Sequence, residues 1–240
     1  MRGLSNFADP NLDALLDEVY GLAEDDPEAA LVKLEDASET WPDQPELLFA
    51  RGELEWTLHG PEAAEPHYRR AVALAPEFAD ARYALGEILG LLGEEQAMIA
   101  ENLEVRRLDT EADIGEGVGT PEDQRFIAQV AEDVLAAIPE EFRDRLNNVP
   151  VVLEARPSEA LVREGFDPRA LGLFEGADDL GQRSSATQDA PTRIVLFFAN
   201  LLASFPDEDA LREEIEVTIL HEIGHFFGLD EQDMERLGLE

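Results

Sequence analysis

The sequence contains no cysteine, and Lys33 is its only lysine among 240 residues. The absence of cysteine excludes disulfide bonds, cysteine-ligated zinc, iron–sulfur clusters and thiol nucleophiles. Residues 1–10 lack the apolar core of a signal peptide. No run of the sequence approaches the roughly 18 to 20 consecutive apolar residues that a membrane helix needs. These absences predict a cytoplasmic, soluble protein.

Basic residues are scarce as well, because 18 Lys and Arg stand against 55 Asp and Glu, for a formal net charge of −37 at pH 7. A field of this sign repels phosphate backbones and anionic lipid headgroups. We therefore expect no nucleic-acid and no membrane partner, and we interpret most acids as a solvated surface. With 44% hydrophobic residues, the chain can bury the core of one large or two modest domains.

The first half repeats itself with a period of about 34 residues. Pro42 and Pro76 are one period apart, and so are Ala30 and Ala64. Three units of this length cover about 11–44, 45–78 and 79–112. Within each unit the small residue allows two helices to approach, and the proline ends the second helix. Each unit is thus predicted to be an antiparallel helix pair.

This pattern resembles the tetratricopeptide repeat family. The middle unit has the family's glycine, small, bulky and small residues and proline, namely Gly52, Ala64, Tyr68, Ala71 and Pro76. The outer units depart from it: Glu18 replaces the glycine in the first, and Asn102, Val105 and Thr110 occupy the last three positions in the third. Terminal repeats face solvent or a neighbouring domain on one side, which fits such departures. The resemblance implies helical repeats over 10–108 that bind a protein or peptide partner.

A change of composition then predicts a domain boundary. Residues 109–120 are rich in glycine and acids without apolar periodicity, so we interpret them as a linker. Thr120-Pro121 is a typical helix start, and the apolar spacing that follows predicts a helix over 121–138. Further on, β-branched runs predict strands at 149–155 and 193–198, separated by turns around Gly165, Gly172 and Gly176. Residues 121–240 are thus predicted to form a small α+β domain.

The chemistry resides in one motif, His221-Glu222-Ile223-Gly224-His225. It lies in a predicted helix that begins near Pro206 and ends before Gly228. Because the histidines are four residues apart, both imidazoles lie on one helix face and can share a metal ion, with zinc as the expected cofactor. Glu222 has the place of a general base that takes a proton from the attacking water. The motif predicts amide hydrolysis.

A third protein ligand is needed for a catalytic zinc site. Gly228 lies where the chain turns in the metzincin pattern H-E-x-x-H-x-x-G-x-x-H, and the residue at the last position is Glu231. Asp230 and Asp233 are close competitors, since spacing alone does not select one carboxylate. The second half has no tyrosine and no other histidine to stabilise an oxyanion, so either zinc acts alone in that role or Arg183 or Arg193 helps.

From Phe126 to the C-terminus the sequence resembles minimal bacterial zincin-like metallopeptidase domains. The resemblance rests on residues 136–149, 171–176, 193–198 and 221–230. It implies a compact α+β zincin fold with a zinc site and, less directly, peptidase activity. The leading hypothesis is a zinc metallopeptidase whose helical repeats recruit a protein. The alternatives are a non-catalytic zinc-binding scaffold and an enzyme whose acidic repeats cover its own cleft.

Overall fold

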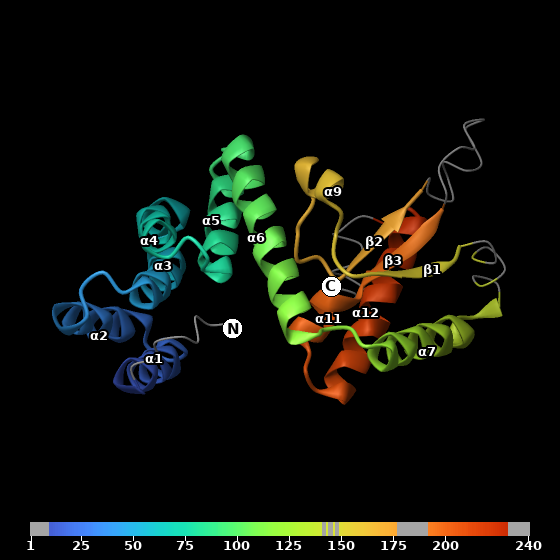
Figure 1. The fold of residues 1–240 in the computed structure, drawn as a ribbon, viewed down its shortest axis with the longest axis horizontal. Coiled ribbons are helices and arrows are strands. Elements are labelled where there is room, and N and C mark those ends of the chain that lie inside the picture. The colour runs from blue at the N-terminus through green and yellow to red at the C-terminus, as the bar shows by residue number, and fades with distance from the viewer. Residues whose placement is uncertain (1–9, 141–142, 144–145, 147–148, 177–191, 230–240) are drawn as a thin grey trace. The chain divides into compact units, whose positions relative to one another are not determined.

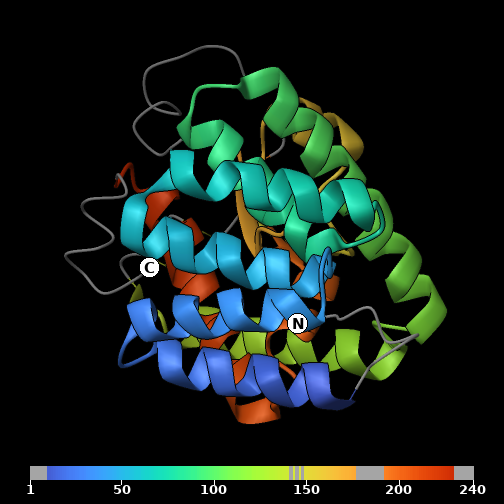
Figure 2. The ribbon, with the colours of Figure 1, turned by 90° about the vertical axis from the view of Figure 1, so that its left-hand side faces the viewer.

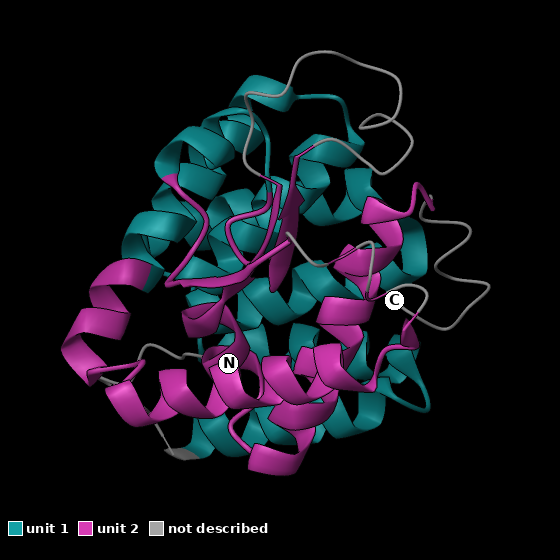
Figure 3. Cartoon of the chain, turned by 90° about the vertical axis from the view of Figure 1, so that its right-hand side faces the viewer, with its two compact units in different colours: residues 1–109, 159–166 teal, residues 110–158, 167–240 magenta. Residues whose placement is uncertain are grey.

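The computed structural model describes residues 10–140, 143, 146, 149–176 and 192–229 (Figure 1). The chain divides into two compact units (Figure 3). Unit 1 comprises residues 1–109 and 159–166, and unit 2 comprises residues 110–158 and 167–240. No helix in the described part of the chain is long and apolar enough to cross a membrane.

Three helix pairs account for most of unit 1, and Figure 2 shows the first two pairs side by side. Several of these helices start with proline, whose fixed φ suits the first helical position. The second helix of each pair begins at Pro27, Pro61 or Glu95, so these starts recur with the period of the sequence repeat. The predicted helical repeat is therefore confirmed, whereas the tetratricopeptide resemblance stays a prediction. The helices are α1 (Pro10–Ala23), α2 (Pro27–Thr40), α3 (Pro45–His59), α4 (Pro61–Leu74), α5 (Ala79–Leu91) and α6 (Glu95–Glu116).

Close approach within the pairs depends on two glycines that are also one repeat period apart. A Cβ atom on Gly52 of α3 would lie 2.5 Å from the Tyr68 ring of α4. A Cβ atom on Gly86 of α5 would lie 2.5 Å from Asn102 Oδ1 of α6. Real Cβ atoms do not come this close to other atoms, so a larger residue at either position would push the helices apart. The repeated glycine therefore sets the helix spacing in two successive units.

Helix α6 corrects the predicted linker at 109–120, because the chain remains helical through Glu116. The buried residues of α6 recur at helical spacing, but three of the four are polar: Asn102, Val105, Asp109 and Asp113. A search for apolar periodicity therefore finds no helix after residue 108. The boundary between the two units falls inside this helix, between residues 109 and 110.

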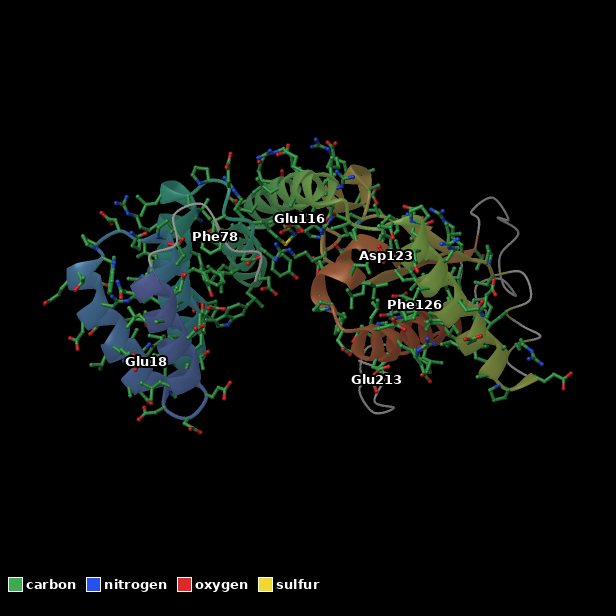
Figure 4. The ribbon with its side chains drawn as sticks, turned by 60° about the horizontal axis from the view of Figure 1, so that its bottom comes forward. Glu18, Phe78, Glu116, Asp123, Phe126 and Glu213 are labelled. Atoms are coloured by element: carbon green, nitrogen blue, oxygen red, sulfur yellow. The ribbon has the colours of Figure 1, made fainter. Side chains whose placement is uncertain are left out.

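The first complete helix of unit 2 is α7 (Pro121–Ala137), which confirms the helix predicted over 121–138. Thr120 and Asp123 form a capping box, in which each side chain accepts the other residue's backbone N–H. Phe126 of α7 (labelled in Figure 4) lies against α12 (Glu208–Phe226). The guanidinium carbon of Arg212 in α12 is 5.1 Å from the Phe126 ring centroid. The two helices share one apolar core with the sheet.

The sheet has three described strands, β1 (Val151–Glu154), β2 (Gly172–Glu175) and β3 (Arg193–Phe197), in the order β1-β3-β2. β1 is parallel and β2 is antiparallel to the central β3. β1 and β3 confirm the predicted strands. The prediction of turns around Gly172 and Gly176 is wrong for residues 172–175. The two glycines flank a run too short to show a period, and pairing with β3, distant in sequence, makes it a strand.

Short helices complete the described chain: α9 (Glu159–Arg163), which clusters with unit 1, and α11 (Phe198–Ser204), which follows β3. The last helix, α12, matches its prediction closely. Asp207 caps its start by accepting the backbone N–H of Ala210 at 3.0 Å, and Gly228 has a φ of +78° just past its end. A left-handed glycine at this position terminates a helix without steric strain.

Candidate metal centre

Two histidines of α12 bring their ring nitrogens together. His221 and His225 are one helical turn apart, their ring centroids are separated by 4.7 Å, and their Nε2 atoms by 3.0 Å. Two imidazole nitrogens that share a tetrahedral zinc at roughly 2.0 to 2.1 Å are about 3.3 Å apart. Both rings are half-buried in the last turns of the helix. The distance between the two Nε2 atoms is therefore close to the distance between two imidazole ligands of one zinc ion.

Glu222 follows His221 directly and is buried, with 7% of its surface exposed. It lies beside Gly172, the first residue of β2. A Cβ atom on Gly172 would lie 3.1 Å from Glu222 Oε1 and 2.6 Å from Thr218 Cγ2. Only glycine leaves room for these two side chains, so β2 can lie over Thr218 and Glu222 of α12 without displacing them. The sequence predicted only a turn around Gly172 and gave no sign of its place beside Glu222.

The register of β2 determines which of its residues face α12. Gly172 contacts Glu222, and Phe174, two residues on, packs edge-on against Phe226 with ring centroids 5.7 Å apart. This alternation is that of a strand with one face on a helix. Within the described residues, β2 pairs on one side only, with β3. The strand beside Glu222 is thus an edge strand of the described sheet.

A buried polar network holds the turn that leads into β2. Asn200 of α11 donates from Nδ2 to the backbone oxygens of Pro168 at 3.1 Å and Ala170 at 2.6 Å. Arg156 donates from Nη1 to Asn200 Oδ1 and makes a two-pronged ion pair with Asp113, its Nη2 being 3.0 Å from Oδ1. Arg156, Asp113 and Asn200 are each at most 9% exposed. The charges are therefore paired, as buried charges must be. Sequence reasoning missed this network, because no local pattern links the three residues.

Arg193, considered above for an oxyanion role, is engaged in the sheet. Its Nε is 2.5 Å from Glu175 of β2 and its Nη1 is 3.1 Å from Glu154 of β1. The hydrogen bond to Glu175 and the charges of both carboxylates raise the pKa of Arg193. The guanidinium ties the two outer strands to β3, so the structure gives it a structural role. Arg183, the other candidate, lies outside the described residues.

The three predicted candidates for the third ligand, Glu231, Asp230 and Asp233, also lie outside the described residues. Within the described part of the chain, no three His, Cys, Asp or Glu side chains come together in a metal-binding group. The two remaining histidines belong to unit 1, where His59 Nδ1 is 2.8 Å and His67 Nε2 is 4.0 Å from the Glu55 carboxylate. Of the predicted site, the described residues thus show His221 and His225 beside Glu222.

Comparison with protein-family models gives one match. Residues 146–239, less than half of the chain, match the model described as zincin-like metallopeptidase. The matched segment contains the three strands, α11 and α12, and with them the histidine pair. Comparison with curated proteins gave no match.

Proposed function

We propose that this protein is a zinc-dependent peptidase that hydrolyses peptide bonds, because residues 146–239 match the family model of zincin-like metallopeptidases. The observation that carries the proposal is the convergence of His221 Nε2 and His225 Nε2 to 3.0 Å next to a buried glutamate. Metal-assisted hydrolysis gives each of the three side chains a role: the two imidazoles would be metal ligands, and the carboxylate would be the general base.

The donor set fits zinc. Imidazole nitrogens are common zinc ligands, and His221 and His225 present them at nearly the separation that a tetrahedral ion requires. We assign the third position to Glu231, with Asp230 and Asp233 as the competitors, because a carboxylate completes the His₂-carboxylate sets of catalytic zinc sites. When bound, zinc supplies Lewis-acid polarisation of a carbonyl and activation of a water molecule.

Glu222 would act as the general base. Gly172 of β2 lies beside its carboxylate, so the strand limits the freedom of the Glu222 side chain on that side. It would accept the proton of the attacking water and later deliver a proton to the leaving amine. β2 lies beside Glu222 at the edge of the sheet as far as the chain is described, and an extended substrate could align there by strand addition. This would explain why a peptide is the substrate class.

The helical half would recruit the protein that is cleaved or a partner that positions the enzyme. Stacked helix pairs create extended surfaces that suit protein segments. The three pairs of unit 1 and their tetratricopeptide-like signature support this role.

The proposal is tested by incubating the zinc-loaded chain with a peptide library and following new termini by mass spectrometry. Glu222→Gln should retain zinc but lower any cleavage rate by roughly two or more orders of magnitude. The matched control is Glu216→Gln, which also removes one negative charge from α12 but at an exposed position. It should leave the cleavage rate unchanged. If both wild type and Glu222→Gln bind zinc, and either neither protein cleaves peptides or both cleave at the same rate, the domain would instead be a non-catalytic scaffold.

The third ligand is tested separately by metal affinity. Glu231→Gln should weaken zinc binding, because a neutral amide oxygen is a poorer ligand than a carboxylate. Asp230→Asn and Asp233→Asn serve as controls, because each removes one negative charge as Glu231→Gln does. Loss of zinc in one of these and not in Glu231→Gln would transfer the assignment to that residue.

A further inference from the structure

The turn that leads into β2 is held from the neighbouring part of unit 2. Asn200 of α11 donates from its amide nitrogen to the backbone oxygens of Pro168 and Ala170. The carbonyl of the next residue, Leu171, accepts the backbone N–H of Phe197 at the end of β3, at 2.8 Å. These three hydrogen bonds fix the backbone directly before the first residue of β2. Two of the three come from the side chain of Asn200.

A carboxamide suits this position chemically. It presents two N–H donors and one carbonyl acceptor, and among neutral side chains only asparagine and glutamine do so. The donors of Asn200 meet the two carbonyls of the turn, and its oxygen accepts from Arg156, whose charge is paired with Asp113. An aspartate of the same shape would keep the acceptor for Arg156 but would have no N–H for the turn. Asn200→Asp therefore removes the hold on the turn and leaves the rest of the network a partner.

The start of β2 lies against a residue of the proposed site. A Cβ atom on Gly172 would lie 3.1 Å from Glu222 Oε1, 3.2 Å from Glu222 Cγ and 2.6 Å from Thr218 Cγ2. Groups packed this tightly do not absorb a displacement of the strand without moving themselves. The position of Gly172 thus sets the space that the Glu222 side chain occupies.

We propose that Asn200 is a positioning residue of the peptidase site. By holding the turn before Gly172, its carboxamide fixes the start of β2 against α12, and the strand in turn limits where the Glu222 carboxylate lies. The inference rests on the proposed function in its last step, where Glu222 is the general base. The hold on β2 itself is measured without zinc and without cleavage, so the two proposals fail separately.

The first test measures backbone amide exchange in the full chain by NMR. The Phe197 amide reports on the entry of β2, because it donates to the Leu171 carbonyl. The Ile194 amide reports on the opposite side of β3, where it donates to Pro150 O at 3.0 Å. Asn200→Asp should accelerate exchange at Phe197 about tenfold or more relative to Ile194, because the hydrogen bonds are lost on one side of β3 only.

A second readout follows the contact between β2 and α12. The nuclear Overhauser effect between the Thr218 methyl group and the Gly172 α-protons should weaken in Asn200→Asp. Asn200→Ala removes the same donors without adding a charge and should show the same pattern, which keeps the test decisive if the carboxylate prevents folding. The matched control is Gln124→Glu, because the Gln124 carboxamide also donates to a backbone oxygen of unit 2, that of Gly119 at 2.8 Å. The control should change neither readout.

Cleavage tests the last step. With a peptide that wild type cleaves, Asn200→Asp should retain its zinc and lower kcat per bound zinc about tenfold or more, because a misplacement of about 1 Å costs up to about a hundredfold in rate. In a Glu222→Gln background the same change should lower the rate less than about twofold, because Asn200 acts through Glu222. A loss caused only by a smaller folded fraction would be the same in both backgrounds.

Three results judge the proposal. If Asn200→Asp accelerates exchange equally at Phe197 and Ile194, Asn200 stabilises unit 2 as a whole and does not position β2. Selective loosening of β2 with an unchanged kcat would overturn the proposal as well, because Glu222 would then not depend on the strand. If wild type cleaves no peptide, the peptidase function fails, while amide exchange and the Overhauser effect still decide whether Asn200 holds β2 against α12.

Discussion

The two units bury different kinds of side chain. In unit 1 the described core consists of apolar and small residues, with Asn102 and Asp109 on α6 as its buried polar residues. Unit 2 buries Asp113, Arg156, Asn200, Thr218 and Glu222. Apolar helix pairs stabilise themselves through local contacts, whereas buried polar groups require partners from distant parts of the chain. The comparison teaches that the unit with the chemistry depends on a few long-range polar contacts for its geometry.

The largest expected effect is on the buried ion pair of unit 2. Arg156→Ala removes the positive charge that pairs with the buried Asp113 carboxylate and the donor to Asn200. Breaking a buried pair in this way should lower the free energy of unfolding by about 3 to 5 kcal/mol. The measurement is urea denaturation of the full chain.

The control is Arg163→Ala, which breaks the exposed pair with Glu159, whose side chains are about 60% exposed. An exposed pair one helical turn apart contributes about 0.3 to 0.5 kcal/mol. If Arg156→Ala and Arg163→Ala lose similar amounts of unfolding free energy, unit 2 does not depend on its buried ion pair in the way described.

Two glycines of equal steric constraint sharpen the comparison. Gly52→Ala would bring a Cβ atom to 2.5 Å from the Tyr68 ring, and Gly172→Ala would bring one to 2.6 Å from Thr218. Overpacking of this kind should cost each variant about 1 to 3 kcal/mol of stability. Only Gly172→Ala should also lower peptide cleavage, because it displaces Glu222. Thermal denaturation and the cleavage assay measured on the same samples would check this.

Gly21 serves as the reference for these substitutions, because a Cβ atom there meets nothing within 4 Å. Gly21→Ala should stabilise α1 by up to about 1 kcal/mol through its helix propensity. A loss of cleavage in Gly52→Ala as large as that in Gly172→Ala would show that the two units are not distinct in this respect.

The smallest expected effect concerns pH and unit 1. Burial and the Arg51 charge lower the pKa of His67, although Glu55 opposes the shift. The folded state therefore favours the neutral ring. The resulting stability is present above the ordinary histidine pKa of 6.5 and is lost as pH falls through the lowered value. Wild type should lose slightly more stability than His67→Gln on acidification through this window. If wild type and His67→Gln lose the same stability on acidification, His67 does not contribute to the pH dependence of stability.

An element could be predicted from the sequence when the residues that fix its conformation lie within the element itself or repeat along the chain. Helix α12 could be predicted in detail because Asp207, the histidine spacing and Gly228 all act within one segment. The helix pairs of unit 1 could be predicted because their contacts repeat along the sequence. Strand β2 could not, since its conformation depends on β3, and the end of α6 could not, since its buried face is polar.

The candidate site divides in the same way. His221, Glu222 and His225 could be identified from their spacing alone. The network of Asp113, Arg156 and Asn200 joins residues 43 and 44 positions apart, so nothing in the local sequence indicates it. It also argues for retaining residues 110–120 in any fragment designed to test whether residues 121–240 fold alone.

Zinc stoichiometry of the purified full chain tests the central claim most directly. Wild type and a His59→Ala/His67→Ala control should each contain about one zinc per chain, since a catalytic site of this type holds one ion. The His221→Ala/His225→Ala variant should contain none, because it lacks both nitrogen ligands. Full zinc occupancy in that double variant would contradict the assignment of the metal centre to α12.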